Sequence, residues 1–398
     1  MTSFTFARTP TLYLGAGRLA SLPAFLAAHR ATSIVLVTGA HSFRASDRLK
    51  RLDHDLRHGG IAVRSFAVAG EPDPAFVDDS VRNLRGHLPD AVVAIGGGSV
   101  IDAGKAIAAM VMEEGSVVDF LEDVGSRTPS GKKVPFVALP TTAGTGSEAT
   151  KNAVLSRSGP GGFKKSLRHD NYVPDVAIID PELAVSCPPE VTAASGLDAI
   201  TQLLEGFVST SASPLSDALA RSGLRSAGGS FERVTRDGDV ASRAQMGYAA
   251  YLSGVVLANA GLGVVHGIAS PLGGLFPIPH GVVCGTLVAE ATRVNIDRLA
   301  AASPEEAAVG TEESASARAK YAEAGALLSG HDAGSAAANC DQLVALLARW
   351  VEELRIPRLG SFGVSPQSLR ELAAQSGVKN GPVKLTPDEI YAIMAARL

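Results

Sequence analysis

Short apolar runs that alternate with helical patterns constrain the fold of this chain more than any other feature. Each run is rich in β-branched residues, and the first two end in a glycine. The runs span residues 33–38, 90–95, 134–139 and 176–179, and the helical patterns cover residues 44–58, 75–88 and 100–113. Because strands that are apolar along their whole length are buried on both faces, this order predicts a parallel sheet covered by helices.

The strand pattern stops after Pro181. From about residue 188 the chain is rich in Ala and Leu with a helical period. Capping residues mark two helix starts, a Ser-Pro pair at Ser213 and the box Thr386-Pro387-Asp388-Glu389. Residues 301–340 are rich in Ala, Ser and Glu, and we expect a loosely packed helix with loops there.

The two patterns divide the chain near residue 184. We predict an α/β domain with a parallel sheet over residues 1–183 and an all-helical domain over residues 184–398. A chain of 398 residues is long enough for two or three domains of ordinary size, so this division agrees with its length.

Composition excludes several classes of function. The 36 Lys and Arg residues are balanced by 40 Asp and Glu, a net charge of −4, which argues against a nucleic-acid-binding protein. The three cysteines, Cys187, Cys284 and Cys340, are far apart, which predicts neither a disulfide framework nor a thiolate zinc site. Because the N-terminus also lacks the apolar stretch of a signal peptide, we predict a cytoplasmic protein.

Residues 244–289 contain no Asp, Glu, Lys or Arg, and a membrane span would also lack these charged residues. However, Asn259, His266 and Pro271, together with several glycines, interrupt every apolar window of the length that a spanning helix needs, about 20 residues. The segment therefore predicts buried helices around a polar centre in a protein that does not enter a membrane.

Two Gly-rich loops follow predicted strands and can bind a nucleotide. Gly96-Gly97-Gly98-Ser99 precedes a helix that begins at Val100, an arrangement in which backbone N–H groups and the helix dipole favour a phosphate. Pro140–Glu148 adds three threonine hydroxyls and one serine hydroxyl after the next strand. Either loop could be a turn without a ligand, but open parallel sheets hold nucleotides at such neighbouring loops.

Asp198, Gln202 and Glu205 lie at i, i+4 and i+7 on one face of the helix predicted for residues 190–208. A carboxylate and an amide one turn apart can share a cation, although a plain amphipathic helix has the same spacing. His266 and His280 lie in the charge-free segment, where buried imidazoles need partners. The four side chains would make a mixed nitrogen and oxygen site for Fe²⁺ or Zn²⁺, but each histidine could equally be a satisfied core residue.

Taken together, these motifs resemble those of the iron-containing (group III) alcohol dehydrogenases. The matching stretches are Gly96–Lys105, Pro140–Glu148, Asp180–Leu183, Gly196–Gln202 with Glu205, and the pair Val265-His266-Gly267 and Pro279-His280-Gly281. The resemblance implies a Rossmann-like domain that binds NADP(H) or NAD(H), and a helical domain that binds one divalent metal, Fe²⁺ or alternatively Zn²⁺. It also implies the fold of dehydroquinate synthase, a cleft between the domains, and a homodimer or larger homo-oligomer.

The resemblance also assigns roles to individual residues. The metal ligands correspond to Asp198, Gln202, His266 and His280. The residues expected to take part in catalysis are His266, Ser270 and His280. The positions that bind the dinucleotide correspond to Gly39, Asp73, Gly97, Gly98, Ser99, Asp102, Thr141, Thr142, Thr145 and Lys164.

Three of these positions depart from the family pattern. Gln202 replaces a histidine ligand, and because an amide oxygen is harder and weaker than imidazole, it predicts looser binding or a different ion. Ser270 replaces a histidine that faces the nicotinamide, so its hydroxyl or a chain of waters would relay the proton. Gly39 replaces an acid that binds the ribose 2′-hydroxyl, so NADPH is expected to be accepted and even preferred.

The chemistry that the resemblance implies is reversible, metal-assisted hydride transfer between a nicotinamide and a small, mostly apolar alcohol or aldehyde. Three alternatives stay open. A sugar-phosphate lyase on the same scaffold or a maleylacetate reductase would need basic residues, and the helices around Asp198 and His266 contain almost none. The third alternative is a nucleotide-binding protein without catalysis, for which Gln202 and Ser270 are the argument.

Overall fold

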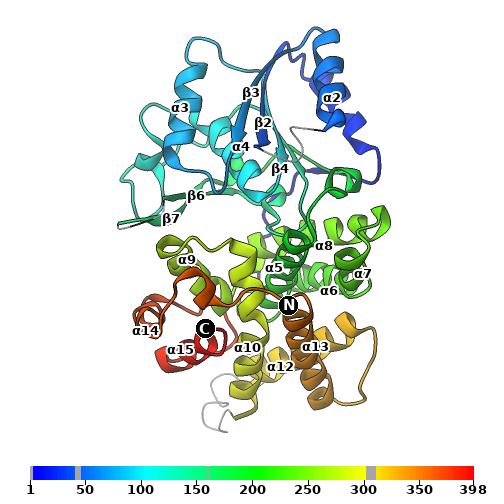
Figure 1. Cartoon of the computed structure of the whole chain (residues 1–398), viewed down its shortest axis with the longest axis vertical. Helices are drawn as coiled ribbons and strands as arrows, with labels where there is room; N and C mark the ends of the chain where they lie inside the picture. Colours follow the sequence, from blue (N-terminus) through cyan, green and yellow to red (C-terminus); the bar gives the residue numbers. More distant parts are fainter. Residues whose placement is uncertain (1–2, 41–45, 158, 160, 302–310) are drawn as a thin grey trace.

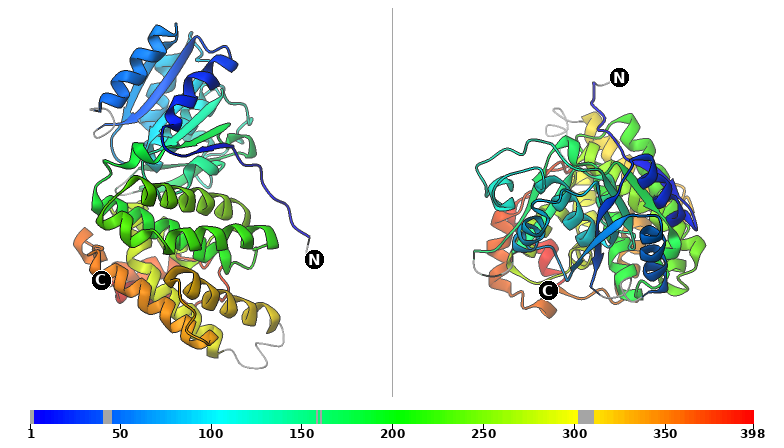
Figure 2. Two further views of the ribbon diagram at one scale, coloured as in Figure 1. Left: turned by 90° about the vertical axis from the view of Figure 1, so that its right-hand side faces the viewer. Right: turned by 90° about the horizontal axis from the view of Figure 1, so that it is seen from above.

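The computed structural model describes residues 3–40, 46–157, 159, 161–301 and 311–398, without the side chains of residues 311–315. An α/β part occupies the upper half of Figure 1 and a helical part the lower half. In Figure 2 the segment before the first strand runs from the sheet along the helical part, and there the Ala7 N–H donates to Asn259 Oδ1 at 2.6 Å.

Six parallel strands form the sheet in the order β1-β8-β5-β4-β2-β3. They are β1 (Thr11–Leu14), β2 (Ser33–Gly39), β3 (Ala62–Val68), β4 (Ala91–Gly96), β5 (Phe136–Pro140) and β8 (Val176–Ile179). The register pairs Thr38 with Ile95 and Gly96 with Pro140, so the loops after β2, β4 and β5 leave one edge of the sheet side by side. The chain moves outward from β2 to β3 and returns to β4, and such a change of direction is where open sheets bind ligands.

Helices cover both faces of this sheet. They are α1 (Ser21–Ala28), α2 (Asp47–His58), α3 (Pro74–Leu84) and α4 (Gly98–Met110). Along β4, Val92 belongs to the apolar cluster that includes residues of α3 and α4, whereas the adjacent Val93 belongs to the cluster that includes α1 and α2. This two-sided burial is the reason why the strand is apolar at every position.

The predicted sheet is confirmed, but the sequence pattern missed four strands. Strands β1 and β3 are the edges of the sheet, where partial exposure removes the continuous apolar run. The other two, β6 (Asn152–Arg157) and β7 (Phe163–Arg168), form a separate antiparallel hairpin. Helix α2 begins at Asp47, and residues 44–45 of its predicted range lie outside the described residues.

The second half of the chain is helical, as predicted. Its helices are α5 (Pro189–Phe207), α6 (Pro214–Gly228), α7 (Phe231–Arg236), α8 (Val240–Ala260), α9 (Val264–Leu275), α10 (His280–Ala301), α12 (Thr311–Ser329), α13 (Ala336–Glu353), α14 (Pro366–Gln375) and α15 (Pro387–Ala395). Ser213 and Thr386 form the capping boxes of α6 and α15.

Two expectations for the helical half can be compared with the structure. Helix α12 is not loosely packed, because Tyr321 and Ala324 are buried against the helical core; residues 302–310 of that stretch lie outside the described residues. Within the described ranges, no single helix is long and apolar enough to cross a membrane, and α8 and α9 meet that criterion only as a pair bent by 98°.

Candidate active site

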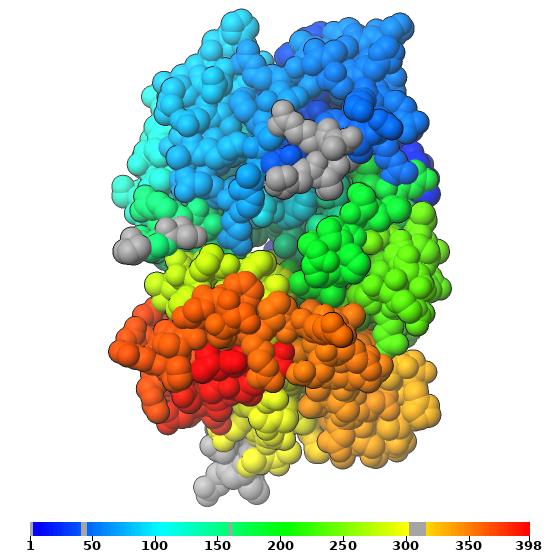
Figure 3. Space-filling view, in the orientation of Figure 1, coloured from blue at the N-terminus to red at the C-terminus, as the bar shows by residue number. Residues whose placement is uncertain are grey.

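A cavity of about 740 Å³ opens between the α/β part and the helical part. Its volume lies within the range of small-molecule sites, roughly 300–1,000 Å³. In Figure 3 the surface is hollowed where the two parts meet. The residues that line it from the two sides include Gly98, Ser99, Asp102, Thr145 and Lys164 from the α/β part and Gln202, His266, Ser270 and His280 from the helical part.

The start of α4 forms part of the upper wall. Gly97 is its N-cap residue, and no side chain caps this helix start, so its first N–H groups are available to an anion. A Cβ atom on Gly98 would lie 2.5 Å from Thr145 Oγ1, so only glycine lets the two loops approach this closely. Beside it, Thr142 Oγ1 lies 3.4 Å from the position of a Cβ on Gly97.

Asp102 is bound by protein groups at the cavity wall. Its Oδ1 accepts a hydrogen bond from the Ser147 hydroxyl at 2.7 Å, and its Oδ2 accepts one from the Val154 N–H at 3.2 Å. The buried Lys105 ammonium donates to the Ser147 and Asn152 carbonyls at 2.9 and 2.7 Å. These contacts join α4, the second Gly-rich loop and β6 into one wall.

The other positions expected to bind the dinucleotide lie in different places. Lys164, on β7, forms an ion pair with Glu71 and faces the cavity. The Asp73 carboxylate accepts a hydrogen bond from the Ala75 N–H at 2.6 Å and caps α3. Of the predicted cofactor residues, those that do not line this cavity are Gly39, Asp73, Gly97, Thr141 and Thr142.

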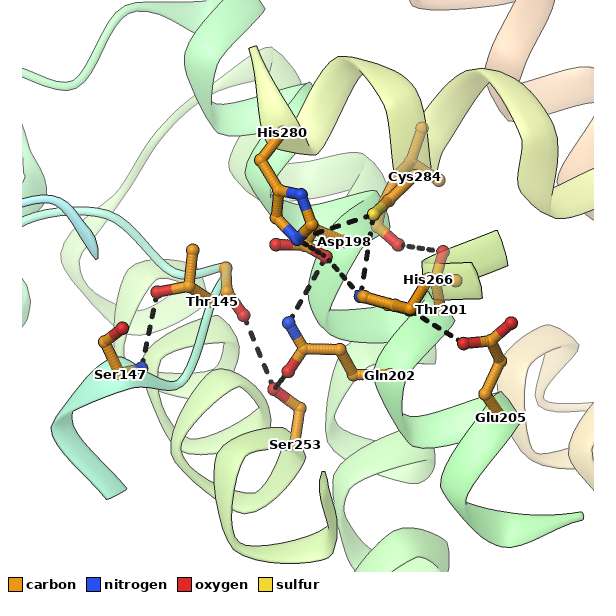
Figure 4. A network of polar contacts seen from close by, with 12 residues as sticks. Thr145, Ser147, Asp198, Thr201, Gln202, Glu205, Ser253, His266, His280 and Cys284 are labelled. Atoms are coloured by element: carbon orange, nitrogen blue, oxygen red, sulfur yellow. Dashed lines mark hydrogen bonds and ion pairs between the residues drawn. The ribbon is translucent and has the colours of Figure 1, made fainter. Parts of the chain in front are cut away.

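Three helices bring metal-ligating side chains together below this wall (Figure 4). Asp198 is on α5, His266 on α9, and His280 and Cys284 are one turn apart at the start of α10. One ligand atom from each lies within 4.8 Å of the other three. Asp198 Oδ1 is 3.4 Å from His266 Nε2 and 3.8 Å from His280 Nε2.

Glu205 fixes the orientation of His266. Its carboxylate oxygens accept hydrogen bonds from the Gly263 and Val265 N–H groups at 2.9 and 2.7 Å, at the start of α9. The same carboxylate lies 2.7 Å from His266 Nδ1. Because a carboxylate only accepts hydrogen bonds, His266 Nδ1 carries a proton, and Nε2 is the ring nitrogen that lies beside Asp198 and Cys284.

Gln202 is oriented differently from the other predicted ligands. Its Nε2 donates to Asp198 Oδ1 at 3.2 Å, and its Oε1 accepts a hydrogen bond from the Ser253 hydroxyl at 2.9 Å. The amide oxygen therefore faces away from the two imidazoles, and an amide nitrogen has no lone pair with which to bind a cation.

Burial and neighbouring charges shift the pKa values in this cluster. Burial raises the pKa of Asp198, but His280 and His266 outweigh it and lower the value to about 2. Burial lowers the pKa of His280 to about 4, so this imidazole is neutral. The second carboxylate oxygen of Asp198 and Nδ1 of His280 are buried with no partner among the described residues. An ionised carboxylate with an unpartnered oxygen beside a neutral imidazole fits a divalent metal.

Comparison with known proteins assigns the family. The family model of iron-containing alcohol dehydrogenases matches residues 9–181, and that of the C-terminal part of the Fe-containing alcohol dehydrogenase family matches residues 192–398. The chain belongs to the iron-containing alcohol dehydrogenase family. The prediction of a metal-dependent, NAD(P)-linked alcohol dehydrogenase is thereby confirmed at the level of the family.

Several members of this alcohol dehydrogenase family are similar to the chain. Long-chain-alcohol dehydrogenase 1 of Geobacillus thermodenitrificans is 42% identical over 228 residues, and the match covers 57% of each chain. The crystal structure of a 1,3-propanediol oxidoreductase superposes with a TM-score of 0.86 at 28% identity, over 100% of both chains. Sulfoacetaldehyde reductase from Bifidobacterium kashiwanohense, solved in complex with NAD⁺, gives a TM-score of 0.84 at 25% identity, over 100% of this chain and 99% of that one.

Sequence reasoning missed the contacts of two residues with the predicted ligands. It placed Glu205 in a motif without a role, although its spacing of i+7 from Asp198 put it on the same helix face. It excluded a thiolate site because the cysteines are far apart, but Cys284 needs no second cysteine to join the histidines. The spacing of His280 and Cys284, four residues apart on one helix, was the signal that could have found it.

Besides Lys164, which the sequence analysis assigned to the dinucleotide, the cleft contains three basic side chains that the sequence argument left out. Lys164, Lys165 and Arg168, all on β7, and Lys379, before the last helix, line the cavity. The first three form ion pairs with Glu71, Asp123 and Glu122, respectively. The helices around the metal cluster are poor in basic residues, as noted, but the cleft as a whole is not.

Proposed function

We propose that this chain catalyses reversible hydride transfer between a nicotinamide dinucleotide and a small, uncharged alcohol or aldehyde, at a divalent metal held by Asp198, His266 and His280. One observation carries the proposal. The three ligands converge on one another, and two of them, His266 and His280, line a cleft that the uncapped start of α4 also lines. A dinucleotide phosphate bound at the start of α4 and a substrate oxygen held at the metal would then share this cleft.

The side chains have distinct tasks in this mechanism. A bound divalent metal supplies Lewis acidity toward the substrate oxygen, and a bound nicotinamide supplies or accepts the hydride. Asp198 provides the negative charge of the site, and Glu205 keeps the Nε2 lone pair of His266 directed at the centre. The Ser270 hydroxyl lines the cavity one turn after His266, donates to the His266 carbonyl at 3.4 Å, and would exchange a proton between the substrate and solvent.

For the cofactor we propose NADP(H), with NAD(H) as the alternative. Gly39 ends β2, where the strand order changes direction, and brings no carboxylate to repel a 2′-phosphate. For the metal, the family description favours Fe²⁺, and Zn²⁺ suits the same nitrogen and oxygen ligands.

The cellular setting is a proposal of the same kind. The three cysteines are unpaired, which suits a reducing cytoplasm. The family resemblance supports a homodimer or larger homo-oligomer, and sedimentation of the purified protein tests this directly.

The experiment that tests the function combines metal analysis of protein purified without chelator with a panel of aldehydes, NADPH and NADH. We expect one equivalent of divalent metal per chain. Uncharged aldehydes should be reduced faster with NADPH than with NADH. His280→Ala should lose metal and turnover while still binding NADPH. Inactivity with every aldehyde, cofactor and added metal would overturn the proposal and favour a nucleotide-binding protein. Preference for anionic aldehydes would instead assign a substrate-binding role to the basic side chains of the cleft.

A further inference from the structure

Cys284 contacts both imidazoles of the metal cluster. Its Sγ lies 3.6 Å from His266 Nε2 and 3.7 Å from His280 Nε2. The cysteine is fully buried, and α10 places it one turn after His280, on the same side of the helix. The thiol therefore faces the nitrogen atoms that are available to a metal.

Four separations within this cluster, those from Asp198 and Cys284 to the two imidazoles, are close to those of a tetrahedral site. Metal–nitrogen and metal–oxygen distances of about 2.0–2.1 Å and a metal–sulfur distance of about 2.3 Å place tetrahedral N and O ligands about 3.4 Å apart, and N and S ligands about 3.6 Å apart. The Asp198 oxygen lies 3.4 and 3.8 Å from the two Nε2 atoms, and the Cys284 sulfur 3.6 and 3.7 Å from them.

The position of Gln202 supports a different fourth ligand. Its oxygen is hydrogen-bonded to Ser253, and its nitrogen donates to Asp198. In this arrangement Gln202 holds the Asp198 carboxylate in place and presents no lone pair with which a metal could be bound. Asp198, which is 1% exposed, keeps a second oxygen without a partner, as expected of a group that takes a cation.

We propose that the Cys284 thiolate, and not the Gln202 amide, is the fourth protein ligand of the metal. This inference rests on the proposed function, because it concerns the ion held by Asp198, His266 and His280. The chain thus lacks a histidine ligand on α5 but supplies a sulfur ligand from α10. Two anionic ligands neutralise a divalent ion, and because thiolate is a softer ligand than imidazole or amide, the set favours Zn²⁺ over Fe²⁺.

Titration of the reduced, chelator-treated full-length protein with Co²⁺ tests this proposal without any assay of activity. A cobalt–thiolate bond produces a charge-transfer band in the near ultraviolet, which nitrogen and oxygen ligands do not. We expect the wild-type protein to develop this band up to one equivalent of Co²⁺. Gln202→Leu and Cys340→Ser should keep the band; the second removes a buried thiol on α13, away from the cluster.

Cys284→Ser should bind Co²⁺ without the band and with more than about 100-fold lower affinity, because loss of a ligand costs more than loss of a ligand's hydrogen-bond partner. Its selectivity for Zn²⁺ over Fe²⁺ should fall by at least about 10-fold. If the serine variant does not fold, Cys284→Ala takes its place. The charge-transfer band of the wild-type protein tests the proposal without any variant.

The outcomes separate this inference from the proposed function. Stoichiometric Co²⁺ binding without the band would overturn the role of Cys284 and leave the metal site standing. Loss of metal affinity in Gln202→Leu, with Cys284→Ser unaffected, would assign the fourth ligand to the amide oxygen after a half-turn of the side chain. No Co²⁺ binding by the wild-type protein would overturn both proposals.

Discussion

Replacing Glu205 by glutamine tests how the protein positions His266. The wild-type carboxylate accepts three hydrogen bonds, from the Gly263 and Val265 N–H groups and from His266 Nδ1. Glutamine has nearly the same shape, but only one of its two terminal atoms accepts a hydrogen bond. Its NH₂ group must therefore face at least one N–H donor, or force His266 to move the proton from Nδ1 to Nε2.

Either arrangement weakens metal binding. A proton on Nε2 occupies the lone pair that would bind the metal, and with the proton on Nδ1 a neutral amide still makes His266 a poorer ligand than a carboxylate does. The unsatisfied buried donor at the start of α9 separately costs about 1–3 kcal/mol of folding stability. Substitution of a residue that holds a metal-binding histidine in place typically lowers metal affinity by about 10–100-fold. We therefore expect Glu205→Gln to weaken metal binding by about 10–100-fold, or about 1.4–2.7 kcal/mol.

Competition against a chelator of known affinity measures this change, with circular dichroism to check the fold. The matched control is Thr201→Val, on the same helix, because the Thr201 hydroxyl donates to the Leu197 carbonyl of its own helix at 2.7 Å. The control should bind metal like the wild type. Metal affinity of Glu205→Gln within about twofold of the wild type would refute the orienting role of Glu205.

Three further predictions concern the cofactor loops and a buried acid. Gly98→Ala should weaken dinucleotide binding by at least about 10-fold in fluorescence titrations while metal content is unchanged, because its Cβ would lie 2.5 Å from Thr145 Oγ1. Gly39→Asp should reduce the preference for NADP⁺ over NAD⁺ by about 10–100-fold in kcat/KM, and an unchanged ratio would contradict the proposed cofactor preference. Burial raises the pKa of Glu148 from 4.5 to about 7, so its contribution to stability is present below pH 4.5 and is lost as the pH rises through 7. Denaturant titrations of Glu148→Gln should show a smaller loss of stability than the wild type between those pH values, by up to about 3 kcal/mol.

The central strands are the part of the fold that the sequence predicts best. Strands β2, β4, β5 and β8 are buried on both faces, so that each is a continuous apolar run. Edge strand β3 consists mostly of exposed and half-buried residues, and hairpin strand β7 contains Lys164 and Lys165, so neither has that pattern. These segments form strands because they pair with neighbouring strands, and the local sequence does not predict such pairing.

Prediction of the site shows a similar division. Asp198, His266 and His280 can be predicted because their motifs and the charge-free segment indicate a buried polar centre, and the structure brings them together. The orientation of the Gln202 amide depends on Ser253, which is 51 residues away in the chain. The contact of Cys284 with His266 depends on how α9 and α10 pack. Neither contact follows from spacing within one helix.

Turnover of the chelator-treated enzyme, measured while divalent metal is added back in steps, tests the central claim that an ion at Asp198, His266 and His280 is required for hydride transfer. We predict that the treated enzyme still binds the dinucleotide but has lost its turnover, and that activity returns in proportion to metal up to one equivalent per chain. Full turnover after complete removal of the metal would contradict the account.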